Sequence, residues 1–174
     1  NSPIDAMKLG MGFLPDDRKA EGVIADLSIR ESMILAVQAK RGMFRLLPRS
    51  EQEKIADKYI KEIQVKTPSM EVPISQLSGG NQQKVILGRW LATNPDFLIL
   101  DEPTRGIDVG AKYEIYCIIN DLVAAGKSVI MISSELPEVL GMSDRIYIMN
   151  EGRFVGEVSG EEATSELIMS RIVK

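Results

Sequence analysis

The sequence predicts an α/β fold with a mostly parallel sheet and an inserted helical subdomain. Two short apolar runs, Phe97–Leu100 and Ser128–Ile132, have the length and composition of buried strands. A helical pattern from about Ala111 to Ala125 separates them, and Gly126 fits the position just after a helix end. Because a strand, a helix and a second strand of the same sheet form a right-handed crossover, the two strands are expected to be parallel.

Two capping-box patterns predict helices in the first half of the chain. Ser28 is followed by Glu31 and Ser50 by Glu53, so each pair can satisfy the free amides at a helix start. The second of these helices carries apolar side chains on one face, namely Ile55, Tyr59, Ile60 and Ile63. Such a one-sided stripe is typical of a small helical subdomain.

The remaining elements complete a four-part organisation. Residues 11–15 are expected to end a strand, and the runs 146–149 and 153–158 to form a hairpin, with a closing helix from about Glu161. The predicted parts are residues 1–19 as the end of a core strand with its turn, 20–76 as the helical subdomain, 77–160 as the core, and 161–174 as the closing helix. On this interpretation the chain begins in mid-fold.

Composition excludes several classes of protein. The chain has 174 residues, of which 44% are hydrophobic and 26% charged, as in ordinary globular domains. A formal charge of −4 and a pI near 5.0 disfavour binding to nucleic acid or to an anionic lipid surface. The single cysteine, Cys117, excludes a disulfide framework, and we expect it to be a small buried apolar residue. No apolar run approaches the roughly 18 residues of a membrane-spanning helix.

The segment Leu77–Lys84, which reads Leu-Ser-Gly-Gly-Asn-Gln-Gln-Lys, is predicted to open a helix. Ser78, Gly79 and Gly80 would present backbone amides, a hydroxyl and the positive end of the helix dipole, all of which favour a phosphate. A serine cap followed by a Gly-Gly loop is the purely structural explanation. The acid pair that begins seventeen residues after Lys84 favours the phosphate-binding interpretation.

That acid pair, Asp101 and Glu102, follows the first apolar run directly. In open α/β sheets, ligands bind at the carboxyl ends of the strands. Asp101 is therefore a candidate magnesium ligand, in part through water, and Glu102 a candidate to orient or deprotonate an attacking water. The structural explanation is a charged exit from a strand into a turn.

These motifs resemble those of ATP-binding-cassette ATPases, specifically the second cassette of bacterial monosaccharide importers of the ribose and galactose type. The resemblance extends over nearly the whole chain and is carried by residues 77–84, 101–112 and 133–138. It implies a partial P-loop NTPase fold with a RecA-like sheet, and ATP and Mg²⁺ as cofactors. No G-x-x-x-x-G-K-[ST] loop is present among the 174 residues, so the segment that grips the nucleotide is missing.

The resemblance also assigns roles to single residues. It implies that Glu102 is catalytic, that Asp101 binds the metal, and that nucleotide contacts come from Ser78, Gly79, Gly80, Gln82, Asp16, Asp108 and Ser134. Asp108 lies at the position of the loop that meets a partner cassette, although an aspartate there can also cap the next helix. Two positions depart from the family pattern, because Asp16 replaces a glutamine and Ser134 a histidine, and the chain contains no histidine.

Partners and location follow from the same resemblance. Residues 77–84 match the signature motif of the family, here called the signature. Two cassettes would enclose ATP, so the signature would complete a site whose P-loop belongs to the first cassette. The site containing Glu102 is expected to be weak or silent, and the fragment alone to be inactive. Further expected partners are membrane permease subunits and, indirectly, a sugar-binding protein, with the protein peripheral on the cytoplasmic face of the bacterial inner membrane.

Three alternatives stay open at this point. A DNA-repair ATPase shares both motifs but inserts a long coiled coil before the signature, and the roughly sixty residues between Asp17 and Leu77 lack sustained heptads. A translation-linked cassette would have no membrane partner. A catalytically silent regulatory cassette would account for Ser134 and Asp16.

Overall fold

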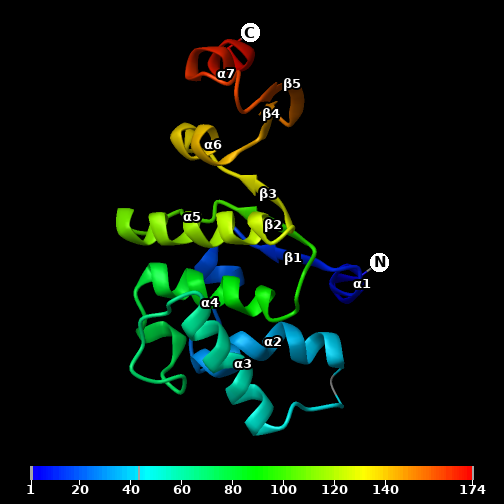
Figure 1. Cartoon of the computed structure of the whole chain (residues 1–174), viewed down its shortest axis with the longest axis vertical. Coiled ribbons are helices and arrows are strands. Elements are labelled where there is room, and N and C mark those ends of the chain that lie inside the picture. Colours follow the sequence, from blue (N-terminus) through cyan, green and yellow to red (C-terminus); the bar gives the residue numbers. More distant parts are fainter. Residues whose placement is uncertain (1, 43, 174) are drawn as a thin grey trace. The chain divides into compact units, whose positions relative to one another are not determined.

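The structure is a computed structural model that describes residues 2–42 and 44–173. It divides into two compact units, residues 1–132 and 133–174 (Figure 1). The finer division expected at residues 19, 76 and 160 stays a prediction.

The first unit is built on a three-stranded parallel sheet in the order β1 (Met11–Leu14), β2 (Phe97–Asp101) and β3 (Ser128–Ile132). The long helix α5 (Val109–Ala124) connects β2 to β3, which confirms the predicted crossover, although the helix begins two residues earlier than expected. Gly126 has the left-handed φ of +83° expected after a helix end. The α/β fold with a parallel sheet is therefore confirmed.

One face of this sheet holds the core of the first unit. Leu14, Leu98 and Leu100 are at most 1% exposed there, and helices α4 (Gly79–Leu91) and α5 contact the sheet. On the other face Phe13 and Ile130, which share one register row with Ile99, are 43% and 49% exposed. The sheet thus has one covered and one open apolar face.

Three further helices complete the first unit. They are α1 (Pro3–Lys8), which the sequence did not predict, α2 (Ile29–Arg41) and α3 (Arg49–Glu62). A short π-helix, η1 (Arg18–Gly22), precedes α2, and a 3-10 turn, η2 (Ile74–Gln76), precedes α4. Figure 1 shows α2 and α3 grouped around α4.

One of the two predicted capping boxes is correct and one is wrong. Ser28 caps α2, and the Ser28 N–H donates in turn to Oε2 of Glu31 at 2.9 Å. Ser50 caps nothing, because α3 begins at Arg49 and its first amide bonds, from Glu51 and Gln52, end on the Pro48 carbonyl.

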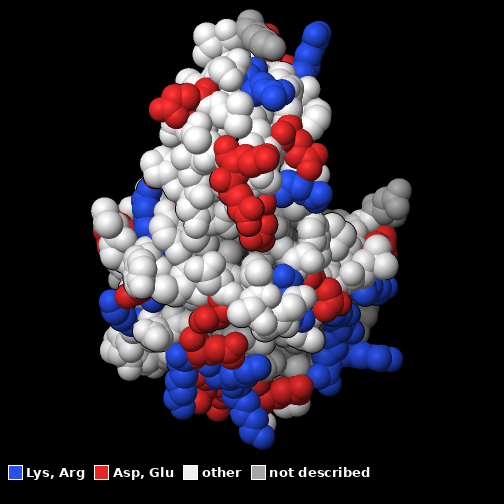
Figure 2. Space-filling view, turned by 45° about the horizontal axis from the view of Figure 1, so that its top comes forward, with Lys and Arg blue, Asp and Glu red and all other residues white. Residues whose placement is uncertain are grey.

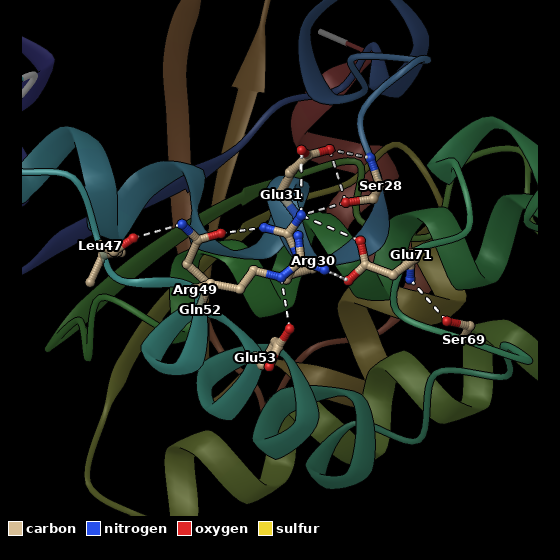
Figure 3. Close-up of polar contacts among 9 residues, drawn as sticks. All are labelled: Ser28, Arg30, Glu31, Leu47, Arg49, Gln52, Glu53, Ser69 and Glu71. Carbon is tan, nitrogen blue, oxygen red and sulfur yellow. Dashed lines mark hydrogen bonds and ion pairs between the residues drawn. The ribbon is translucent and has the colours of Figure 1, made fainter.

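A buried arginine holds α2, α3 and the loop before η2 together (Figure 3). Arg30 is 5% exposed, and its Nε lies 3.0 Å from Oε1 of Glu71. Its Nη1 donates to Gln52, whose amide in turn donates to the Leu47 carbonyl at 2.7 Å. Arg49 adds a second cation 2.9 Å from the same Glu71 oxygen. Side chains from three segments are thus fixed around one guanidinium.

The second unit contains α6 (Leu136–Met142), the antiparallel pair β4 (Arg145–Asn150) and β5 (Arg153–Ser159), and α7 (Ser165–Ile172). The predicted hairpin is confirmed. The closing helix begins four residues later than expected, because Thr164 provides the capping oxygen for the Leu167 amide. The small core of the second unit contains Ile146, Ile148, Val158 and Ile168.

Candidate functional site

The start of α4 has the geometry that the sequence predicted for the signature. Ser78 has an extended backbone and caps the helix, and its Oγ accepts from Nδ2 of Asn81 at 2.9 Å. Gly79 and Gly80 form the first turn, where amides have no intrahelical carbonyl to bond. Ser78 is exposed, Gly79 is half-buried and Gly80 is buried, so an external anion can approach the start of α4 at Ser78 and Gly79.

Gly80 has a packing role that the sequence analysis did not foresee. A Cβ at Gly80 would lie 2.4 Å from Cβ of Ala111, so α4 and α5 approach each other too closely there for any side chain. Asp108 caps α5 through the Ala111 amide at 3.0 Å, which confirms its capping role. The start of α4 and the start of α5 are therefore in direct contact.

The two glutamines after the signature glycines have different contacts. The Gln82 amide donates to the carbonyls of Ile74 and Leu77, at 3.3 and 3.1 Å, and so fixes the turn that enters the signature. Its proposed contact with nucleotide stays a prediction. The Gln83 amide donates to the Pro103 carbonyl at 2.8 Å in the interior, which ties the signature helix to the loop of the acid pair. The sequence analysis missed this bond.

The acid pair lies at the carboxyl end of β2, as predicted. Asp101 is in register with Ile132 of β3, and the Glu102 N–H donates to the Ile132 carbonyl at 2.8 Å. Glu102 has a left-handed φ of +46°, an uncommon conformation for a residue with a side chain. Burial, and then the nearby charges of Asp16 and Glu102, raise the pKa of Asp101 above its ordinary value. Two neighbouring carboxylates thus act on Asp101 at this edge of the sheet.

Asp16 follows β1 at the same edge and is paired with a cation. Both of its carboxylate oxygens lie 2.6 Å from Nη1 of Arg105. Hydrogen bonding to Asp16 is the largest cause that raises the pKa of Arg105. The sequence analysis did not identify Arg105 as a site residue, and no local pattern connects two positions 89 residues apart.

Arg18 brings a second cation to the signature. A Cβ on Gly79 would lie 3.1 Å from Nη2 of Arg18. Burial lowers the pKa of Arg18, and its Nε is buried without a hydrogen-bond partner. The positive end of a helix disfavours a cation, and the charge of the neighbouring Asp17 offsets this only in part, because burial still leaves the pKa of Arg18 lowered.

Ser134 belongs to the second unit, where it precedes α6. The neighbouring Ser133 hydroxyl bonds to Glu138 and accepts from the Glu135 N–H at 3.0 Å. The role of Ser134 toward nucleotide stays a prediction.

Charges of both signs cover the face shown in Figure 2, where Lys and Arg side chains lie beside Asp and Glu side chains. This face offers no broad basic surface of the kind that binds nucleic acid. Within the described part of the chain, no three His, Cys, Asp or Glu side chains gather into a metal site by themselves.

A family model described as "ABC transporter" matches residues 4–105. Among curated proteins, the chain is 53% identical over 171 residues to the galactofuranose transporter ATP-binding protein YtfR of Escherichia coli K12, covering 98% of this chain and 34% of that protein. It is 54% identical over 170 residues to the ribose import ATP-binding protein RbsA of Clostridium perfringens strain 13, covering 97% of this chain and 34% of that protein. The chain thus spans about a third of the length of these relatives.

Solved structures support the fold independently. The dimeric, post-hydrolysis ATP-binding cassette MJ0796, bound to ADP and Pi, matches with a TM-score of 0.73 and 25% identity, covering 86% of this chain and 62% of that one. The cassette MJ1267 matches with a TM-score of 0.80 and 21% identity, covering 98% of this chain and 71% of that one.

Proposed function

Because the chain belongs to the ABC transporter family, we propose that it is part of the ATPase that powers sugar import, and that it supplies the signature to a shared ATP site. The observation that carries the proposal is the hydrogen bond from Gln83 of the signature helix to the Pro103 carbonyl, which joins both family motifs in one packed unit. Relatives that are about half identical and are named as ribose, xylose and galactofuranose transport proteins support sugar import.

The residues present fit ATP and Mg²⁺. Ser78, Gly79 and Gly80 would contact the terminal phosphate, with Arg18 close enough to add positive charge. In the other of the two sites, Asp101 would hold Mg²⁺, and Glu102 would orient or deprotonate the attacking water. When bound, Mg²⁺ neutralises phosphate charge. Asp108 would face the partner cassette, while Asp16, Gln82 and Ser134 would lie around the nucleotide.

Two cassettes would share each nucleotide, and the partner that grips the phosphates would be the first cassette of the same chain or of a second one. Permease subunits and, indirectly, a sugar-binding protein would complete the assembly at the cytoplasmic face of the bacterial inner membrane. Across residues 2–42 and 44–173, no helix combines the length and apolar character needed to cross a bilayer. Membrane attachment through the permease is compatible with that finding.

We further propose that the two sites are unequal. The family pattern places a histidine where this chain has Ser134, and a glutamine amide where it has the carboxylate of Asp16. Neutral serine cannot supply the charge of a protonated imidazole to the γ-phosphate. This half would then contribute mainly its signature, and the catalytically silent alternative would apply to the Glu102 site alone.

Import is favoured over the other cassette functions by the names of the relatives and by the mixed charge of the surface in Figure 2. A translation-linked cassette would copurify with ribosomes, whereas an import cassette would copurify with membrane permease. Recovery on ribosomes alone would contradict the proposal.

Substitutions in the complete gene product that contains this chain test the function and its asymmetry. Ser78→Arg should abolish ATP hydrolysis, since it fills the anion cap with a large side chain. Glu102→Gln should reduce hydrolysis much less. Ser75→Arg places the same side chain on an exposed position three residues earlier and is the matched control. Equal losses from Ser78→Arg and Glu102→Gln would refute the asymmetry.

The 174 residues alone should show no measurable ATP turnover, because no P-loop holds the β- and γ-phosphates. Steady-state phosphate release by the purified fragment measures this directly. Turnover that survives Ser78→Arg in the fragment would come from a contaminant, whereas turnover abolished by that change would contradict the proposal.

A further inference from the structure

Arg89 places a guanidinium in the interior near the end of α4. It is 7% exposed, and burial lowers its pKa to about 10, so it remains a cation at neutral pH. Its Nε donates to the Ser32 carbonyl and its Nη1 to the Gly22 carbonyl, both at 2.8 Å. Among the described residues no carboxylate pairs with it, and its Nη2 is buried without a hydrogen-bond partner.

Stability alone does not account for an arginine at this position. A buried cation loses its hydration, and two carbonyl hydrogen bonds replace that hydration only in part. Apolar side chains of similar volume often replace buried charged groups without loss of stability. An apolar residue cannot donate hydrogen bonds to two carbonyls. This ability of Arg89 indicates that it positions the segments that carry those carbonyls.

The two carbonyls belong to different segments, and both segments lie against the signature helix. Ser32 is in α2, which contacts α4 closely, and Gly22 is the last residue of η1. A Cβ on Gly22 would lie 2.7 Å from Cδ1 of Ile86, so η1 touches α4 directly at this point. At its other end η1 begins with Arg18, beside Gly79. The segment therefore contacts α4 both at the signature and near Arg89.

We propose that Arg89 is a positioning residue that fixes the signature helix to η1 and α2, and thereby sets where Ser78 and Gly79 meet the nucleotide. Without its two hydrogen bonds, α4 can shift along η1, and the cap formed by Ser78 moves with it because the helix is rigid. Arg89 touches neither nucleotide nor metal. The inference rests on the proposed function of the signature, and it adds the residue that holds the signature in place.

Two substitutions in the complete gene product test this role. Arg89→Met keeps the length of the side chain but removes both hydrogen bonds, and Arg89→Lys keeps the charge but has one nitrogen for two carbonyls. Arg49→Met, on the exposed side of α3, is the matched control. The measurements are KM and kcat for ATP, the melting temperature, and hydrogen exchange of residues 17–23 and 78–83.

We expect Arg89→Met to raise KM for ATP about tenfold at an unchanged melting temperature, since a displaced cap weakens nucleotide binding more than folding. Arg89→Lys should recover part of this loss, and Arg49→Met should match wild type. Exchange should rise in both measured segments of Arg89→Met. Wild-type kinetics in Arg89→Met would overturn the proposal. If that variant does not fold, Arg89→Lys decides, and a stable, fully active lysine variant would overturn it.

Failure of the proposed function gives a different result. If the wild-type protein hydrolyses no ATP, or Ser78→Arg has no effect on hydrolysis, the assigned activity is wrong. Hydrogen exchange then tests the position of α4 without nucleotide. Faster exchange at residues 78–83 in Arg89→Met supports the positioning role, and unchanged exchange there overturns it.

Discussion

Asp16 and Arg105 connect the turns that follow two neighbouring strands, with both oxygens of the carboxylate 2.6 Å from the same guanidinium nitrogen. Asp16 follows β1, and Arg105 follows the acid pair at the end of β2. The pair therefore joins the turn that leads to η1 with the loop that Gln83 anchors to α4. In this chain the negative charge at position 16 is compensated within the molecule.

This ion pair should contribute little to stability and should depend on salt. The side chains of Arg105 and Asp16 are 65% and 39% exposed, and such pairs contribute about 0.5 kcal/mol. A double-mutant cycle with Asp16→Ala and Arg105→Ala, measured by urea unfolding, should give a coupling of that size at low salt. At 1 M NaCl, where the Debye length is about 3 Å, the coupling should approach zero. A coupling insensitive to salt would contradict a solvent-screened pair.

Substitution of the second signature glycine should disrupt packing as well as function. Gly80→Ala places a methyl group 2.4 Å from Cβ of Ala111, so α4 and α5 must move apart. Overpacking of this kind costs about 1–3 kcal/mol. Urea unfolding should show a loss of that size in Gly80→Ala without any nucleotide present.

The neighbouring glycine and a compensating change provide the controls. Gly79→Ala meets the end of the flexible Arg18 side chain at 3.1 Å and the Gly106 carbonyl at 3.5 Å, an ordinary van der Waals contact, and should destabilise less than Gly80→Ala. Ala111→Gly removes the opposing methyl group and should restore stability to Gly80→Ala. A double variant no more stable than Gly80→Ala would show that the clash lies elsewhere.

The elements predicted correctly are those whose signals are local. The capping box at Ser28, the parallel strands around Asp101 and the helix that Ser78 opens each depend on residues within a few positions of one another. Ser50 fits the same capping pattern but fails, since the first amide bonds of α3 end on the Pro48 carbonyl and Ser50 is already inside the helix. A four-residue motif does not reveal at which of two neighbouring residues the helix will begin.

The contacts that organise the site are long-range, and the sequence contained no signal for them. Arg105 bonds across 89 residues to Asp16, and Arg89 across 67 residues to Gly22. Gln83 was noted only as part of the signature, because its bond to the Pro103 carbonyl depends on how the loop after β2 packs against α4. Residue type and spacing can indicate the groups that meet a ligand, but the residues that hold those groups in place depend on tertiary packing.

Acid should weaken the start of α2 through Glu31. Hydrogen bonds from the Ser28 N–H and then its hydroxyl hold the pKa of the Glu31 carboxyl below its ordinary value. A carboxyl with a lowered folded-state pKa stabilises the fold above its unfolded pKa of about 4.3, and this contribution is lost as pH falls through the folded value. The wild-type urea midpoint should therefore fall more between pH 7 and pH 3 than that of Glu31→Gln. Equal falls would show that the capping box does not depend on this charge.

Removal of Glu114 should leave a buried cation uncompensated. Lys84 is 1% exposed, and its Nζ lies 2.5 Å from Oε2 of Glu114 and 3.0 Å from the Gln64 carbonyl. Glu114→Gln preserves the shape of the side chain but removes its charge, so Lys84 keeps only neutral acceptors. Loss of one partner from a partly buried pair should lower the free energy of unfolding by about 2 kcal/mol, measured by urea unfolding.

Lys66 provides the matched comparison, because it pairs with the same carboxylate at 3.1 Å but is 76% exposed. Lys66→Met should therefore cost less than about 1 kcal/mol. The double change Lys84→Met with Glu114→Gln should recover much of the stability lost in Glu114→Gln, because it removes the buried charge together with its partner. If Glu114→Gln destabilises no more than Lys66→Met, the exposed Lys66 would account for what Glu114 contributes to stability. The buried Lys84 would then have no part in how α4 packs against α5.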